Sequence, residues 1–145
     1  MARITRQLMT LMLPLAFAGC GGSSSAPTST TTTSSAPYSQ TDLVVGAGAD
    51  AIAGRNVTVA YGGWFYDTSR ADGKGAQFDS SSSFPFLLGA GRVIAGWDRG
   101  VVGMKVGGQR RLIIPPDLAY GSRGLPPTIP PNATLLFDVT LLAVQ

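Results

Sequence analysis

Residues 93–102 read Val-Ile-Ala-Gly-Trp-Asp-Arg-Gly-Val-Val, and this stretch decides the fold because it is the one segment with a helical apolar period. Ile94, Trp97 and Val101 recur at positions i, i+3 and i+7, which places them on one face of a short helix. Gly107-Gly108 then marks a break before the next element. A single short helix with one apolar face needs another layer to cover that face.

Segments typical of strands surround the helix and predict that layer. Residues 55–67 and 134–144 alternate apolar and polar side chains, which indicates strands with one buried face. Residues 84–88 form a short apolar run, and residues 109–114 form a further strand that ends at Pro115-Pro116. Turn-rich loops are expected at residues 69–75 and 117–132. The pattern predicts an α+β domain over residues 41–145, with an antiparallel sheet packed on the helix.

The composition excludes much of conventional enzyme chemistry. The chain of 145 residues has no histidine, no glutamate and one cysteine, Cys20. Without histidine, neither Ser-His-Asp nor Cys-His nucleophilic catalysis is available. One cysteine allows neither an intrachain disulfide nor a multi-cysteine metal site. The sequence therefore predicts a function that needs no metal or other cofactor.

The first nineteen residues have the pattern of a bacterial export signal. Arg3 and Arg6 precede an apolar stretch over residues 8–18, which is too short to span a membrane as a helix. It runs into Phe-Ala-Gly before Cys20, which resembles the lipobox of bacterial lipoproteins. The resemblance implies cleavage after residue 19 and lipidation of Cys20. An ordinary secretory signal with a stray thiol is the alternative.

Residues 20–40 are expected to form a flexible tether between that lipid anchor and the folded part. They are mostly Ser, Thr, Gly, Ala and Pro, with no charged residue, so they cannot bury enough apolar surface to offset their ordering entropy. We expect the protein at the bacterial cell envelope, held by its lipid and facing the periplasm or the outer surface, with the choice of membrane open. Nine basic and eight acidic residues remain without Arg3 and Arg6, which argues against a nucleic-acid partner.

Six motifs along the folded part occur in an order that identifies a family. They are Phe78-Asp79-Ser80-Ser81, Phe86-Leu87-Leu88-Gly89, Val93-Ile94-Ala95-Gly96-Trp97, Gly108-Gln109-Arg110-Arg111, Pro116-Asp117-Leu118-Ala119-Tyr120-Gly121, and residues 129–139 with Ile129-Pro130-Pro131 and Phe137-Asp138-Val139. The series resembles the FK506-binding-protein (FKBP) family of peptidyl-prolyl cis–trans isomerases over about residues 43–144. The resemblance implies a bent antiparallel sheet of five or six strands wrapped around one short α-helix.

The resemblance also implies a ligand pocket between the helix and the sheet. Catalytic roles carry over to Tyr120, Asp79, Phe78, Phe137 and Trp97. Substrate-binding roles carry over to Tyr61, Phe84, Val93, Ile94 and Ile129. Trp97 would form the floor, and the Tyr120 hydroxyl and the Ile94 backbone N–H would bind substrate carbonyls. The arginine that usually pairs with the carboxylate equivalent to Asp79 is missing, and Arg70 is a candidate substitute.

Each of these residues also has a purely structural interpretation. The aromatic side chains would usually be core, and Asp79 could be a turn former ahead of the serine run. With the resemblance, the sequence predicts a prolyl isomerase that acts on proline-containing segments of exported proteins during their folding. Macrolides of the FK506 type are further expected ligands, and a monomer is expected. A non-catalytic tethered chaperone that only binds such segments is the second interpretation.

Overall fold

Five strands and one α-helix make up residues 35–145, the part of the chain that the computed structural model describes. The elements are β1 (Ser39–Val44), β2 (Asn56–Tyr66), β3 (Lys74–Leu87), α1 (Ala95–Val101), β4 (Gln109–Ile114), the 3-10 helix η1 (Pro116–Leu118) and β5 (Leu135–Val144). The predicted export signal, Cys20 and most of the predicted tether lie outside the described residues. Within residues 35–145, no helix is long and apolar enough to cross a membrane.

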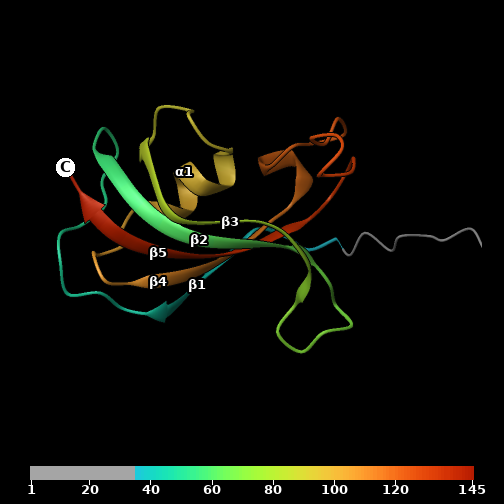
Figure 1. The fold of residues 1–145 in the computed structure, drawn as a ribbon, viewed down its shortest axis with the longest axis horizontal. Helices are drawn as coiled ribbons and strands as arrows, with labels where there is room; N and C mark the ends of the chain where they lie inside the picture. Colours follow the sequence, from blue (N-terminus) through green and yellow to red (C-terminus); the bar gives the residue numbers. More distant parts are fainter. Residues whose placement is uncertain (1–34) are drawn as a thin grey trace, which may run out of the picture. The chain divides into compact units, whose positions relative to one another are not determined.

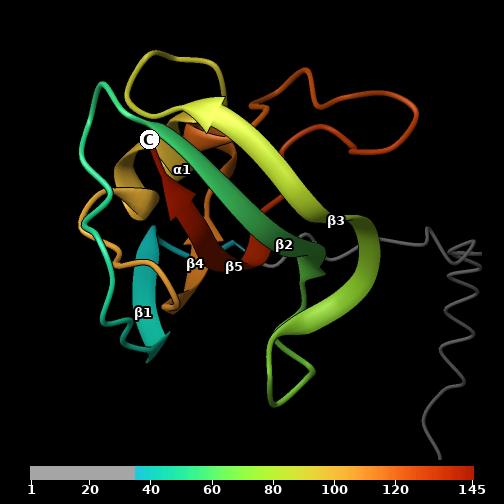
Figure 2. The ribbon, with the colours of Figure 1, turned by 60° about the vertical axis from the view of Figure 1, so that its left-hand side comes forward.

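The strands form one antiparallel sheet in the order β1-β4-β5-β2-β3. Figure 2 shows this order, and Figure 1 shows the sheet curving beneath α1. β5 lies between β4 and β2, and its residues from Leu135 to Val139 are all buried. β2 follows the predicted alternation, with Val57 and Val59 buried and Asn56 exposed. The predicted α+β fold, a curved antiparallel sheet around one short helix, is confirmed with five strands.

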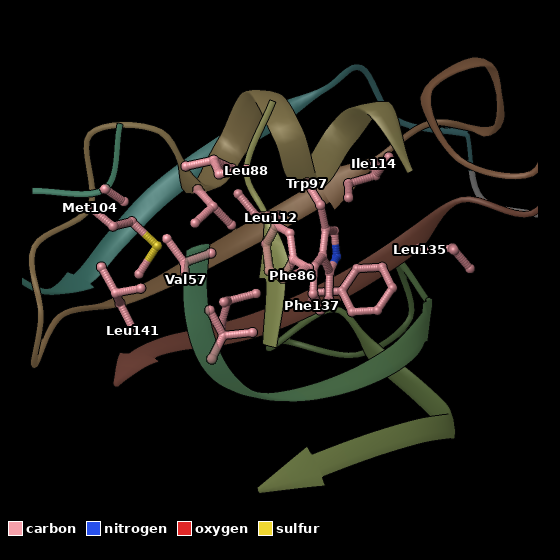
Figure 3. Close-up of a cluster of buried hydrophobic side chains, with 14 of the residues drawn as sticks. Val57, Phe86, Leu88, Trp97, Met104, Leu112, Ile114, Leu135, Phe137 and Leu141 are labelled. Carbon is pink, nitrogen blue, oxygen red and sulfur yellow. The ribbon is translucent and has the colours of Figure 1, made fainter. Parts of the chain in front are cut away.

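Two glycines allow α1 to lie very close to β4. A Cβ atom on Gly96 would be 2.5 Å from Ile114 Cγ2, and one on Gly100 would be 2.5 Å from Leu112 Cδ2. Real Cβ atoms do not approach other atoms so closely, so a larger residue at either position would force the facing side chain to shift. Trp97 lies between these glycines and points its ring into the space between helix and sheet (Figure 3).

The helix is shorter than the sequence pattern predicts. It begins at Ala95 because Ile94 has an extended ψ of 148°, and it ends at Val101 because Val102 has a ψ of 131°. The Ile94 carbonyl nevertheless accepts the backbone N–H groups of Trp97 (2.9 Å) and Asp98 (3.3 Å). Ile94 is thus the N-cap, and the residue before it belongs to the preceding loop.

The core fills the concave side of the sheet beneath α1. Figure 3 shows Trp97 beside Phe86 and Phe137, with Leu112 and Ile114 of β4 nearby. The largest fully buried side chains of this cluster are aliphatic: Val57, Val59, Leu88, Val101, Leu112, Ile114, Leu135, Val139 and Leu141. The aromatic members lie toward one end of this cluster, and that end is the pocket described below.

Two strands include residues for which the sequence predicts no strand. Lys74 and Gly75, expected in a loop, belong to β3, which is 14 residues long. Ser39 and Gln40, assigned by composition to the tether, belong to β1, which pairs with β4 at the edge of the sheet. Neither segment has a clear hydrophobic alternation, because β1 is almost wholly exposed and the first half of β3 is largely so.

Candidate active site

A cavity of about 420 Å³ opens between α1, the concave face of the sheet and the loop that follows η1. It is lined by Tyr61, Phe78, Asp79, Phe84, Arg92, Val93, Ile94, Trp97, Tyr120, Leu125, Thr128, Ile129 and Phe137. The cavity therefore brings together all ten side chains that the sequence predicts for the site. Arg92, Leu125 and Thr128 are additional, and nothing in their spacing marks them out, because loop residues follow no period.

Aromatic rings form the floor and walls of this cavity. Trp97 is packed edge-to-face against Tyr61, with ring centroids 4.8 Å apart, and against Phe137, at 5.2 Å. Phe78 meets Phe137 edge-to-face at 5.6 Å on the other side. Trp97 and Phe137 are each only 4% exposed, so they are core residues as well as pocket walls. Such interlocked rings fix one another in place and leave a rigid apolar hollow.

Gly63 of β2 makes room for two of these rings. A Cβ atom at this position would be 2.8 Å from Phe137 and 2.9 Å from Phe78. Gly63 is paired with Phe137 across β2 and β5 and with Asp79 across β2 and β3. A glycine at this register position lets both rings pack closely over the β2 backbone.

The Asp79 carboxylate is held by hydrogen bonds and not by an ion pair. Tyr61 Oη donates to it at 2.7 Å, and the Ser80 backbone N–H donates to it at 2.8 Å. The predicted pairing with Arg70 is wrong, because Arg70 Nε lies 4.0 Å from Asp67 at the turn between β2 and β3. Burial and the bond to Asp79 raise the pKa of Tyr61 far above its usual value, so this hydroxyl keeps its proton.

The serine run after Asp79 forms a bulge in β3. Tyr61 is paired with Ser81, but Val59, two residues earlier in β2, is paired with Phe84, three residues later in β3. The additional residue bends β3 locally and changes which of the following side chains face the cavity. As a result both Asp79 and Phe84 line the same cavity.

Tyr120 enters the pocket from a loop that is held by hydrogen bonds between its own backbone groups. The Gly121 N–H donates to the Pro116 carbonyl at 2.7 Å, and the backbones of Leu125 and Ile129 exchange two bonds of 2.8 Å each. Within residues 35–145 the Tyr120 hydroxyl has no hydrogen-bond partner, so it is available to a ligand. Burial, followed by the nearby Asp79 carboxylate, raises the pKa of Tyr120, and the hydroxyl is therefore a donor at neutral pH.

The loop before α1 is held by Asp98 of that helix. The Asp98 carboxylate accepts the backbone N–H groups of Gly89 (2.9 Å) and Gly91 (3.0 Å). This clamp fixes the segment that carries Arg92, Val93 and Ile94 to the pocket edge. In the described part of the chain, the Ile94 N–H has no hydrogen-bond partner, which gives the pocket a second available donor.

The site thus combines an apolar aromatic hollow with two positioned neutral donors. No group of three His, Cys, Asp or Glu residues that could hold a metal ion occurs within residues 35–145. Neither tyrosine hydroxyl gives up its proton at neutral pH, so neither is a general base there. The arrangement can bind a compact apolar group and hold adjacent carbonyls. These features define a class: a small α+β domain with a ligand pocket between its sheet and its single helix.

Comparison with known proteins places this class in a family. Residues 48–142 match the family model described as FKBP-type peptidyl-prolyl cis-trans isomerase. The chain is 50% identical over 105 residues to FK506-binding protein 1B of Neurospora crassa (strain ATCC 24698 / 74-OR23-1A / CBS 708.71 / DSM 1257 / FGSC 987), covering 70% of this chain and 93% of that protein. It is 45% identical over 103 residues to an FK506-binding protein of Neisseria meningitidis serogroup A / serotype 4A (strain DSM 15465 / Z2491), covering 71% and 92%.

A solved structure agrees with the sequence matches. The crystal structure of AtFKBP13 superimposes with a TM-score of 0.64 at 36% identity and covers 74% of this chain and 93% of that one. Other matching relatives are longer, and this chain spans about a quarter of their length. The chain belongs to the family of FKBP-type peptidyl-prolyl cis–trans isomerases, which confirms the family predicted from the six motifs.

Proposed function

We propose that this protein accelerates cis–trans isomerisation of X–Pro bonds in other polypeptides, with the cavity beneath α1 as its active site. The observation that carries the proposal is the pairing of an aromatic hollow with two unengaged donors, the Tyr120 hydroxyl and the Ile94 N–H. The proline ring would lie over Trp97, between Phe78 and Phe137. The two donors would hold the carbonyls on either side of it.

This chemistry needs no acid, base or metal. Rotation about an amide breaks no covalent bond, and the barrier of about 18–20 kcal/mol is the loss of resonance. A twisted amide has lost conjugation and is less dipolar than a planar one. A water-poor aromatic cavity therefore disfavours the planar ground state relative to the twisted transition state. The absence of histidine and glutamate from the sequence does not impair such a mechanism.

The test is the rate of cis–trans exchange in a short peptide with one X–Pro bond, measured by NMR exchange spectroscopy. This readout needs no coupling protease. We expect the protein to accelerate exchange well above the spontaneous process, which takes tens to hundreds of seconds. The Trp97→Ala variant, once shown to be folded, should lose most of this acceleration. Exchange at the spontaneous rate with folded wild-type protein would contradict the proposal.

The second candidate function is binding without turnover, as in a chaperone for proline-containing segments. The same cavity supports it, because a rigid apolar hollow with two donors binds whether or not it lowers a barrier. A pure binder would broaden or shift the peptide resonances and leave the exchange rate unchanged. The names of the relatives support binding of FK506-type macrolides in the same cavity. Competition between FK506 and the peptide measures this directly.

The proposed setting is the cell envelope, where the protein acts on exported proteins as they fold. The support is the sequence of residues 1–40: an export-like segment, a single cysteine after Phe-Ala-Gly, and an uncharged Ser/Thr-rich segment. Cys20→Ser should release the protein from membranes on fractionation of the bacterial cell, with a substitution at nearby Ser24 as control. Unchanged membrane association of Cys20→Ser would contradict lipid anchoring. We also propose a monomer, which sedimentation analysis of residues 35–145 would check.

A further inference from the structure

The pocket lining contains two charged side chains of opposite sign, and only one of them is engaged. Asp79 stands on β3 and receives hydrogen bonds from Tyr61 (2.7 Å) and Ser80 (2.8 Å). Arg92 stands on the loop before α1, next to Val93 and Ile94. The two charges form no ion pair with each other, because their charged atoms are not within 4.0 Å.

The Arg92 guanidinium is available to a ligand. Across residues 35–145 it forms no hydrogen bond, ion pair or ring contact, and its side chain is exposed. Most other basic side chains of the domain are engaged: Arg70, Lys74, Lys105, Arg110 and Arg111 pair with carboxylates, and Arg99 stacks on Tyr38. Arg92 thus differs from these in presenting an uncompensated charge at the cavity.

The backbone beneath Arg92 is fixed, although its side chain is free. The Asp98 carboxylate clamps the backbone N–H groups of Gly89 and Gly91, immediately before Arg92. On the other side Ile94 caps α1 through its carbonyl. The backbone that carries the guanidinium is therefore held two residues before the Ile94 N–H, which is available to a substrate carbonyl. Because Arg92 lines the cavity, a polypeptide bound there lies close to this charge.

We propose that Arg92 is a specificity-determining residue that favours X–Pro segments with an aspartate or glutamate beside the proline. The proposal rests on the proposed isomerase function and names the substrate class for that same cavity. A guanidinium has a planar set of donors that matches a carboxylate. Asp79 lies on a different wall and is occupied by its own donors. The preference is therefore expected at one flank of the proline and not at the other.

The expected size of the effect follows from the exposure of Arg92. An ion pair between exposed side chains contributes little, and a two- to five-fold gain in kcat/KM is about what such pairs supply. The gain should shrink as salt is raised from about 0.05 M to about 0.5 M, because surface charges are screened over a few ångströms at high ionic strength.

The experiment compares three peptides at each flank of the proline, with Asp, Asn or Lys at the varied position and alanine elsewhere. NMR exchange gives kcat/KM for each after subtraction of the spontaneous rate. For the wild-type protein we expect Asp to exceed Asn and Asn to exceed Lys at one flank. Arg92→Gln should reduce the Asp-to-Asn ratio to near one, and Arg92→Glu should reverse the order of Asp and Lys.

The control is Arg55→Glu, which changes the net charge as much as Arg92→Glu does. Arg55 is exposed, does not line the cavity and forms no side-chain pair within residues 35–145, so its variant should keep the wild-type order. Equal rates for the three peptides, or a preference that persists in Arg92→Gln, would overturn the inference while the isomerase function stands. No acceleration of the neutral Asn peptide by wild-type protein would overturn both.

Discussion

Tyr61 Oη lies 2.7 Å from the Asp79 carboxylate and donates to it across β2 and β3. The bond joins two neighbouring strands at the edge of the cavity. Tyr61 is in turn packed edge-to-face on Trp97 at 4.8 Å. The hydrogen bond therefore orients the Tyr61 ring, which packs on Trp97 at the floor of the pocket. It also fixes the Asp79 carboxylate, which forms no ion pair with a basic side chain within residues 35–145.

Tyr61→Phe should lower the free energy of unfolding by about 1 kcal/mol, the usual net contribution of one hydrogen bond. The ring and its packing on Trp97 remain, so the loss reports on the hydroxyl alone. Denaturant unfolding of Tyr61→Phe, Asp79→Asn and the double variant measures the coupling between the two groups. If the two single losses simply add, the bond contributes nothing to stability.

Tyr120→Phe should reduce kcat/KM by about three- to ten-fold, because one neutral hydrogen bond to a substrate carbonyl contributes about 1 kcal/mol. The unfolding midpoint should not change, since the hydroxyl has no partner in the described part of the chain. Because the pKa of Tyr120 is raised above its ordinary value of about 10, the wild-type rate should be flat from pH 6 to pH 9. A rate that falls toward pH 9 would contradict a Tyr120 hydroxyl that keeps its proton across this range.

Phe137→Ala should destabilise the protein by about 3–5 kcal/mol and abolish most activity. The ring is 4% exposed and contacts Trp97, Phe78 and Tyr61, so its loss opens a cavity in both core and pocket. Thermal unfolding and peptide exchange measure the two effects. Phe137→Leu fills more of the space and should lose less of each. Phe137→Ala with near wild-type stability would place the ring outside the core.

Gly100→Ala should destabilise the protein by about 1–3 kcal/mol through overpacking, despite the better helix propensity of alanine. Its Cβ would lie 2.5 Å from Leu112 Cδ2 and 2.9 Å from the Tyr38 hydroxyl. Leu112→Val in the same chain should recover part of the loss by removing the clash. A chemical denaturation series on the single and double variants tests this, and a stabilised Gly100→Ala would contradict the close contact of α1 with β4.

Asp138 should make the protein sensitive to acid. Its carboxylate, 9% exposed, is 2.7 Å from Lys74 Nζ and 2.7 Å from Arg111 Nε. Burial opposes ionisation, but the hydrogen bonds from Arg111 and Lys74 prevail and lower the pKa of Asp138. The group ionises at lower pH in the folded than in the unfolded chain. Its contribution is therefore present above about pH 4 and is lost as pH falls through the lowered pKa.

Asp138→Asn should cost about 3 kcal/mol at pH 7, because it leaves two cations beside a neutral group. The variant should also lose much of the decline in stability below pH 4. Asp117→Asn is the matched control, since Asp117 is exposed in η1 and forms no ion pair within residues 35–145. Equal pH profiles for the two variants would exclude Asp138 as the source of acid sensitivity.

Much of this fold could be predicted from the sequence because its central elements are buried on one face. Alternation in β2 and the spacing of Ile94, Trp97 and Val101 reflect that burial directly, whereas β5 is buried on both faces from Leu135 to Val139, which its alternation does not predict. β1 could not be found in this way, since its side chains face solvent on an edge strand and carry no period. β3 is likewise mostly exposed from Lys74 to Ser83 and includes a run of four serines, and its hydrogen bonds to β2 produce no hydrophobic pattern in such residues.

The features of the site likewise fall into those that the sequence predicts and those that it does not. Eight of the ten predicted pocket residues lie in motifs whose order resembles a family, and Tyr61 and Phe84 follow from the same resemblance. The cavity brings all ten side chains together. The partner of Asp79 was not predictable, because the register that sets Tyr61 beside it depends on a bulge in a run of identical serines. Arg92 gave no signal either, since an exposed arginine in a loop is ordinarily a solvated surface residue.

The contact of α1 with β4 through Gly96 and Gly100 has an evolutionary consequence. Trp97, which forms the floor of the cavity, lies between those two glycines in α1. The two glycines pack against Ile114 and Leu112 of β4. Neither of these aliphatic residues lines the pocket. A change in their bulk would raise or lower the helix and, with it, the depth of the hollow. Natural substitutions at Ile114 and Leu112 can therefore change which ligands fit the pocket, although neither residue contacts the ligand.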